Sequence, residues 1–132
     1  MIIKLTPQIT LAIIDDHRVW REKLGEMLAV GFTITMRIAN GKEFLDTLEK
    51  STTLPDVCLL DISMPVMDGY ETAKRLRELY PEIKILAFSM ETDEIVIAKM
   101  MKSGAHGFIP KGVSLEDLTN AIIEVYNTGF YL

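Results

Sequence analysis

Five polar side chains that could act together in phosphate chemistry stand directly after short apolar segments. Asp15 and Asp16 follow one such segment, and Asp61 follows another. Ser89 and Lys111 follow two more. Taken singly, each residue has an ordinary interpretation, and Asp16 in particular could simply cap a following helix. Because they recur at four segment ends, a shared site is the better interpretation.

These residue types favour phosphoryl transfer. Three carboxylates held close together repel one another, and each opposes ionisation of its neighbours. A divalent cation removes this penalty, and Mg²⁺ suits a few carboxylates together with water and a phosphate oxygen. Lys111 would add a fixed positive charge, and Ser89 would add a hydroxyl group. We therefore predict a Mg²⁺-dependent site in which an aspartate is the nucleophile.

The order of the apolar segments predicts how these residues come together. Five segments rich in apolar or β-branched residues alternate with segments of helical spacing. The strands are predicted at 9–14, 33–39, 57–60, 83–88 and 107–109, and the helices near 20–28, 43–48, 70–80, 93–102 and 114–125. This alternation indicates an α/β fold in which helices cover both faces of a parallel sheet. All strand ends then share one edge, although the pattern does not fix the strand order.

Local signals predict several helix ends. Asn40 with Glu43, and Ser114 with Asp117, resemble capping boxes at the start of the second and fifth helices. Gly31 is placed to end the first helix.

Composition restricts the class of protein. The 132 residues fit one domain, and 48% apolar with 25% charged residues is an ordinary globular mixture. A net charge of −5 argues against direct binding to a nucleic-acid backbone. A single cysteine, Cys58, cannot form an internal disulfide and favours a reducing compartment. No signal peptide stands at 1–7 and no apolar stretch could span a bilayer, so we expect a cytoplasmic protein without a membrane contact.

The motifs together resemble the receiver domain of two-component response regulators. The resemblance is carried by Asp-Asp-His at 15–17, Leu-Leu-Asp-Ile-Ser-Met-Pro-Val-Met-Asp-Gly at 59–69, Ser89, and Phe-Ile-Pro-Lys at 108–111. It implies the flavodoxin-like doubly wound (βα)5 fold, with a five-stranded parallel sheet in the order 2-1-3-4-5. Residues 87–90, 102–108 and 127–132 resemble the NarL/LuxR-type subfamily, which carries a C-terminal helix-turn-helix. On this basis 1–132 is one receiver domain, with a core at 9–128 and the start of a linker at 129–132.

The resemblance also implies roles for individual residues. Asp61 would be the phosphoacceptor. Asp16 would ligate Mg²⁺ directly, Asp15 would assist through water, and the Ser63 backbone carbonyl would complete the protein ligands. Lys111 would contact a phosphoryl oxygen.

Further positions correspond to the switch of the family. Ser89 would move to bind the phosphoryl group, and Phe108 would turn inward with it. The side chains of Ser63 and Glu91 match positions that tune dephosphorylation. Phe108 lacks the hydroxyl that a tyrosine would carry, and Gly112 rather than proline follows the lysine, so a cis peptide is not assumed there.

The implied function is that of a signalling switch rather than of a conventional enzyme. The domain would take a phosphoryl group from a sensor histidine kinase and would catalyse its own phosphorylation and dephosphorylation. We expect a phosphorylation-dependent homodimer that uses the apolar helix around 95–101. Transcription would be controlled through a DNA-binding domain outside this chain.

Four alternatives differ from this interpretation. A stand-alone receiver would act through protein contacts, and an inactive pseudo-receiver would lack the chemistry. A haloacid-dehalogenase-like phosphatase would need a second aspartate where Ser63 stands. A flavodoxin-like FMN carrier would need a phosphate loop where the sequence has two acids.

Overall fold

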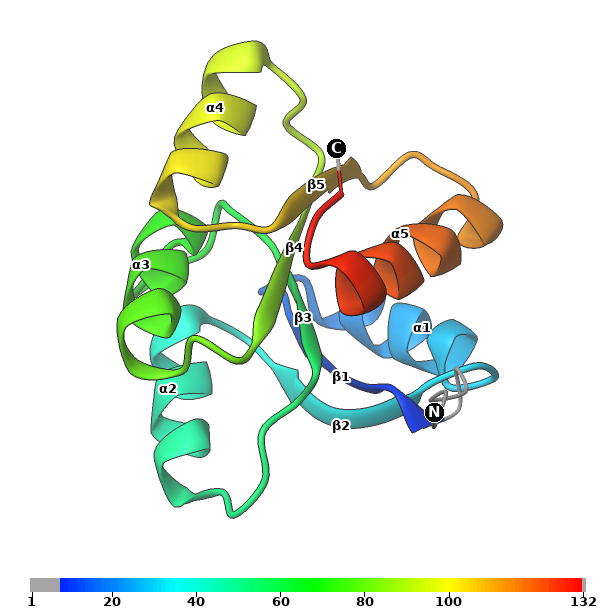
Figure 1. Cartoon of the computed structure of the whole chain (residues 1–132), viewed down its shortest axis with the longest axis horizontal. Helices are drawn as coiled ribbons and strands as arrows, with labels where there is room; N and C mark the ends of the chain where they lie inside the picture. The colour runs from blue at the N-terminus through cyan, green and yellow to red at the C-terminus, as the bar shows by residue number, and fades with distance from the viewer. Residues whose placement is uncertain (1–7, 132) are drawn as a thin grey trace.

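Within residues 8–131, five strands alternate with five helices (Figure 1). The computed structural model describes residues 8–131, so the segment 1–7, where no signal peptide is expected, lies outside it. The strands are β1 (Thr10–Ile14), β2 (Thr33–Ile38), β3 (Val57–Leu60), β4 (Lys84–Ser89) and β5 (Gly107–Pro110). The helices are α1 (Arg18–Leu28), α2 (Gly41–Lys50), α3 (Gly69–Leu79), α4 (Glu94–Ser103) and α5 (Leu115–Thr128). The predicted alternation is confirmed, with boundaries that differ by a few residues.

All strands are parallel, in the order β2-β1-β3-β4-β5. Helices α1 and α5 cover one face of the sheet, and α2, α3 and α4 cover the other (Figure 1). The architecture implied by the receiver resemblance is therefore correct. Within the described residues, no helix is both long and apolar enough to cross a membrane.

Two apolar cores, one on each face, explain the buried apolar runs of β1, β3 and β4. Along β1, Leu11 and Ile13 point into the core beneath α1 and α5. Ala12 and Ile14 point into the core beneath α2, α3 and α4. Because neighbouring side chains of a strand point to opposite faces, a strand covered on both sides has no solvent-facing position.

The predicted caps of α2 and α5 are confirmed. The Asn40 side chain accepts a hydrogen bond from the Glu43 backbone N–H, and Ser114 accepts one from Asp117 N–H. Both pairs are three residues apart, so this local spacing satisfies N–H groups that the first turn leaves unpaired.

The start of helix α1 excludes the alternative that Asp16 is its cap, and its end differs from the expectation. His17, not Asp16, is its N-cap, and the imidazole Nδ1 accepts from Trp20 N–H at 3.2 Å. The C-cap is Ala29 rather than the glycine at 31. Since Ala29 keeps right-handed helical angles, the helix ends without the left-handed residue that a glycine would serve.

The single cysteine has a packing role. Cys58 lies on β3 with no exposed surface, and burial raises the pKa of its thiol. A thiol held in its neutral form is a poor nucleophile, so Cys58 acts as a small apolar residue.

Candidate functional site

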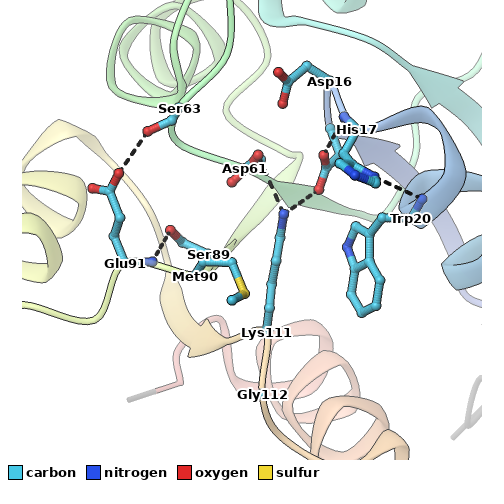
Figure 2. A pocket seen from close by; sticks show the side chains of 11 residues that line it. Asp16, His17, Trp20, Asp61, Ser63, Ser89, Met90, Glu91, Lys111 and Gly112 are labelled. Carbon is cyan, nitrogen blue, oxygen red and sulfur yellow. Dashed lines mark hydrogen bonds and ion pairs between the residues drawn. The ribbon is translucent and has the colours of Figure 1, made fainter.

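A cavity of about 580 Å³ opens at the edge of the sheet where the strands end (Figure 2). The acids come from the ends of β1 and β3, Ser89 is the last residue of β4, and Lys111 follows β5. These strands are neighbours in the sheet, so the five predicted site residues meet. The lining residues are Asp15, Asp16, His17, Trp20, Asp61, Ser63, Ser89, Met90, Glu91, Lys111 and Gly112.

The three aspartates could hold a cation together. One carboxylate oxygen from each of Asp15, Asp16 and Asp61 lies within 4.8 Å of the other two. Asp15 and Asp61 are buried, whereas Asp16 is exposed and its carboxylate has no partner among residues 8–131. Hard oxygen ligands with room for water fit Mg²⁺. The donor set therefore agrees with the predicted metal.

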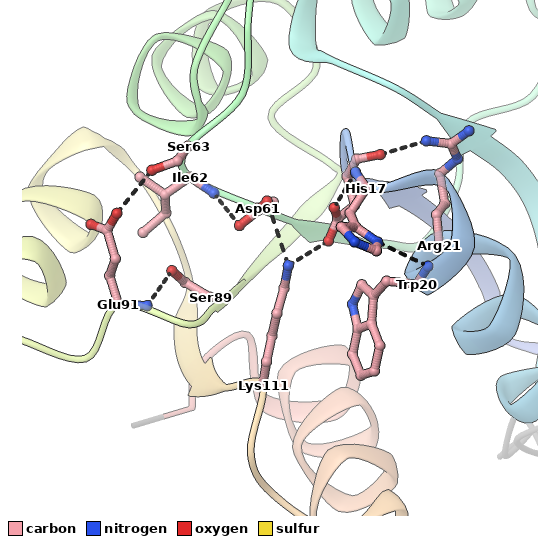
Figure 3. Close-up of polar contacts among 10 residues, drawn as sticks. His17, Trp20, Arg21, Asp61, Ile62, Ser63, Ser89, Glu91 and Lys111 are labelled. Carbon is pink, nitrogen blue, oxygen red and sulfur yellow. Dashed lines mark hydrogen bonds and ion pairs between the residues drawn. The ribbon is translucent and has the colours of Figure 1, made fainter.

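Lys111 compensates part of this negative charge. Its Nζ donates to Asp15 Oδ2 at 2.6 Å and lies 3.5 Å from Asp61 Oδ2 (Figure 3). The lysine side chain is itself only 10% exposed, so solvent and salt screen the attraction between these charges only weakly. All described peptide bonds are trans, including Lys111–Gly112.

The surroundings of the Asp61 carboxyl group raise its pKa. Burial, followed by the negative charge of Asp15, raises its pKa to about 6. The ammonium of Lys111 and the Ile62 backbone N–H, which donates to Asp61 Oδ1 at 2.9 Å, oppose this rise. A carboxylate with a raised pKa at a cavity mouth is a good candidate for a nucleophile.

The turn between β1 and α1 is fixed from two sides. The His17 backbone N–H donates to Asp15 Oδ1 at 2.9 Å, and Arg21 Nη1 donates to the Asp15 carbonyl at 2.7 Å. His17 lines the cavity beside these acids. The sequence patterns did not single out Arg21, whose position one turn after the cap was the available signal.

The loop after β3 folds back closely onto Asp61. The Gly69 N–H donates to the Ile62 carbonyl at 2.8 Å, and a Cβ at Gly69 would lie 2.4 Å from the Asp61 carbonyl oxygen. Only glycine fits this approach, which explains its place in the motif. In the same loop, Val66 has φ 70°, a left-handed conformation that is unfavourable for a β-branched residue.

Two loops meet across the cavity mouth. Ser63 Oγ donates to Glu91 Oε1 at 2.9 Å, and the Glu91 backbone N–H donates to Ser89 Oγ at 3.0 Å (Figure 2). The hydroxyl of Ser89 is thus already engaged as an acceptor. Phe108 is turned inward, 6% exposed, within the core beneath α2, α3 and α4.

Comparison with known proteins agrees with this geometry. Residues 11–123 match the response regulator receiver domain family. The chain is 33% identical over 127 residues to the transcriptional regulatory protein DegU of Brevibacillus brevis, which covers 95% of this chain and 53% of DegU. It is 33% identical over 115 residues to the nitrate/nitrite response regulator protein NarL of Escherichia coli (strain K12), which covers 86% of this chain and 52% of NarL. The chain thus spans about half the length of these curated relatives.

Solved structures share the fold. A LuxR-family DNA-binding response regulator from Staphylococcus aureus superposes with a TM-score of 0.83 at 24% identity, over 91% of this chain and 100% of that one. The family match favours a receiver over the phosphatase and the FMN carrier considered from the sequence. The chain therefore belongs to the response regulator receiver domain family of two-component systems, and its relatives include DegU and NarL.

Proposed function

We propose that this domain accepts a phosphoryl group on Asp61 from a sensor histidine kinase. The observation that carries the proposal is the placement of Asp61: a buried carboxylate at a strand end, facing a cavity and 3.5 Å from the Lys111 ammonium. An Asp61 oxygen attacks phosphorus, and the bond to the donor nitrogen breaks as the acyl phosphate forms. Lys111 then faces the added negative charge.

The reaction depends on Mg²⁺ in this proposal. Asp15, Asp16, Asp61 and the Ser63 backbone carbonyl would hold the ion. Bound there, it neutralises the crowded acids and the phosphoryl oxygens. The acidic group supports this assignment because it gathers three carboxylates against one ammonium within the site.

Labelling with a small phosphodonor tests the proposal. Incubation with acetyl phosphate and Mg²⁺ should add one phosphoryl group, and peptide mapping should place it on Asp61. Asp61→Asn should abolish the adduct, as should chelation of Mg²⁺. The matched control is Asp46→Asn, which removes an exposed carboxylate of α2 that pairs with Lys42. Label that persists in Asp61→Asn would refute the assignment.

Phosphorylation would switch the domain through Ser89. Its Oγ now accepts from the Glu91 N–H, and a move toward Asp61 would let its O–H donate to a phosphoryl oxygen. The added charge of about −1.5 to −2 favours that move. The resemblance implies that Phe108 turns inward with Ser89, but Phe108 already lies inward in this structure, so the expected signal is a shift of α4, which lies between the two residues in sequence. Ser63 and Glu91 would tune how fast the acyl phosphate is hydrolysed.

The output we propose is phosphorylation-dependent self-association, with transcription controlled through a DNA-binding domain outside this chain. The relative DegU is named a transcriptional regulatory protein, which supports an output of this kind. The surface at the start of α4 supports it, because Met90 and Ile95 are 75% and 78% exposed. Val96, Ile97 and Met101 are only partly buried beside them. Exposed apolar side chains grouped in this way favour a protein partner.

Light scattering with a beryllofluoride mimic tests this switch. The wild-type domain should increase in mass when the mimic and Mg²⁺ are added, and Ser89→Ala should respond less. Ile95→Glu should block association without changing Asp61 labelling. Val30→Glu, at an exposed apolar position away from α4, is the control. An unchanged mass in the wild type would contradict the proposed output and leave the phosphoacceptor proposal standing.

A further inference from the structure

The cavity beside Asp61 has an apolar wall that the acids and the metal do not explain. Trp20 stands on one side of the Lys111 side chain and Met90 on the other (Figure 2). Met90 is 75% exposed at the mouth, whereas Trp20 is half-buried. A phosphoryl group and its cation need oxygen and nitrogen contacts, so an apolar wall has a different partner.

Trp20 is fixed next to the reacting atoms. Its ring packs against Phe88 with 6.1 Å between ring centroids, which holds the indole in place. The Lys111 Nζ lies 5.9 Å from the centroid of the Trp20 ring and 3.5 Å from Asp61 Oδ2. A single ammonium group therefore separates the ring from the proposed nucleophile. The indole N–H is buried without a hydrogen-bond partner among residues 8–131.

We infer that Trp20, with Met90 opposite, binds the imidazole ring of the phosphohistidine donor and so determines which phosphodonors this site prefers. The inference rests on the proposed function, because it concerns the group that leaves when Asp61 is phosphorylated. Trp20 acts here on the donor, not on the acyl phosphate that results.

The chemistry of the transfer requires a place for this ring. As the Asp61 oxygen bonds to phosphorus, the P–N bond breaks and its electron pair stays on the ring nitrogen. A ring protonated on its other nitrogen leaves as neutral imidazole. In-line displacement places this leaving group on the side of phosphorus away from Asp61, toward the cavity mouth. A flat aromatic ring there can pack on the indole, since aromatic pairs are favourable at centroid separations of about 4.5–7 Å.

Two phosphodonors with the same reacting P–N bond distinguish binding of the ring by Trp20 from an effect of Trp20 on phosphorylation in general. Phosphoramidate and monophosphoimidazole both transfer from nitrogen, and only the second carries a ring. We compare kcat/KM for phosphorylation of Asp61 by each donor, with Mg²⁺, in wild type, Trp20→Leu and Trp20→Phe. Phosphorylated protein is quantified by intact mass spectrometry, because the Trp20 variants lack the tryptophan fluorescence that would otherwise report the reaction. The control is Val19→Ala, 72% exposed on the same helix and outside the cavity lining.

Trp20→Leu should lower kcat/KM for monophosphoimidazole by about 3- to 10-fold, mainly through KM, and change phosphoramidate by less than about twofold. Trp20→Phe, which keeps a flat ring, should recover most of the loss, and Val19→Ala should match wild type. An equal loss with both donors would mean that Trp20 only supports the fold, and no loss with either donor would mean that the ring binds elsewhere. Either result overturns the inference while Asp61 is still labelled. Failure of both donors to label wild-type Asp61 would refute the proposed function instead.

Discussion

The Lys111 ammonium is bound to Asp15 at 2.6 Å, closer than to the proposed phosphoacceptor, from which it is separated by 3.5 Å. Lys111 therefore has two tasks. It neutralises Asp15 within the cluster, and it remains within reach of a group added to Asp61. The cluster as a whole is short of positive charge, because three carboxylates face one ammonium.

Removing Lys111 should destabilise the metal-free domain. Lys111→Met leaves a buried carboxylate without its partner, and breaking such a pair costs about 3–5 kcal/mol. Because Asp15 keeps its hydrogen bond from the His17 N–H, we expect about 2–4 kcal/mol in urea unfolding with EDTA at pH 7. Lys42→Met, which breaks an exposed pair with Asp46, should change stability by less than about 1 kcal/mol. Equal effects of the two substitutions would contradict this electrostatic assignment.

Asp61→Asn should stabilise the metal-free domain at neutral pH. The folded-state pKa of Asp61 is raised from 3.8 to about 6, so ionising it costs stability as pH rises through this interval. Above pH 6 the cost is complete, and the substitution should gain about 1–3 kcal/mol. Below pH 3.8 the gain should disappear. Thermal unfolding of both proteins across pH 4–8 in EDTA measures this, and a gain that does not depend on pH would show another cause.

Asp16 should matter more than Asp15 for Mg²⁺ affinity. The Asp16 carboxylate is exposed and has no other partner in residues 8–131, so it can ligate directly. Asp15 is engaged by Lys111 and by the His17 N–H. Loss of a group that only supports the metal ligands, as proposed for Asp15, weakens metal binding by about 10–100-fold. Loss of a direct ligand such as Asp16 should weaken it further. Titration followed by fluorescence of Trp20, the single tryptophan, compares Asp15→Asn with Asp16→Asn, and equal affinities would refute the ranking.

The fold should lose stability in mild acid through His106. Burial first, and then the charges of Arg77 and Lys84, lower the pKa of His106 to about 4 from its usual 6.5. The His106 Nδ1 also accepts from Ile85 N–H at 3.0 Å. Since the neutral form is needed only in the folded state, stability is complete above pH 6.5 and falls as pH decreases toward 4.

His106→Asn tests this dependence, because its amide oxygen can still accept from Ile85 N–H. Between pH 7 and pH 5 the wild type should lose about 1–2 kcal/mol more than the variant, after allowance for partial solvent screening. Urea midpoints at the two pH values give the comparison. Parallel pH profiles for the two proteins would show that His106 is not the sensitive group.

The elements and the membership of the site could be predicted from sequence because both are local signals. Four of the five apolar runs stop where a polar site residue begins, as at Asp61 and Lys111. The caps at Asn40 and Ser114 depend on a partner three residues away. The strand order needed more, since spacing alone does not choose among parallel sheets, and it came from the resemblance to a family.

The contacts inside the site could not be predicted, because they join residues far apart in sequence. Lys111 lies 96 residues from its nearest carboxylate, and Ser63 lies 28 residues from Glu91. The choice of His17 over Asp16 as the cap depends on the turn at Asp15, which hydrogen bonds from the His17 N–H and from Arg21 hold in place. The left-handed backbone at Val66 also has no signal in its residue type.

The strand order has a consequence for the dynamics of the site. The acids extend from β1 and β3, whose backbones are hydrogen-bonded to a strand on each side. Lys111 follows β5, which among the described residues has β4 on one side and a single bridge from Gly107 to Tyr131 on the other. Amide hydrogens of β1 and β3 should exchange with deuterium only when the whole domain opens, and those of β5 should exchange through smaller fluctuations. The proposed metal ligands and phosphoacceptor are thereby held by the most slowly exchanging backbone, while Phe108 lies in, and Lys111 directly follows, a strand that can respond without unfolding its neighbours.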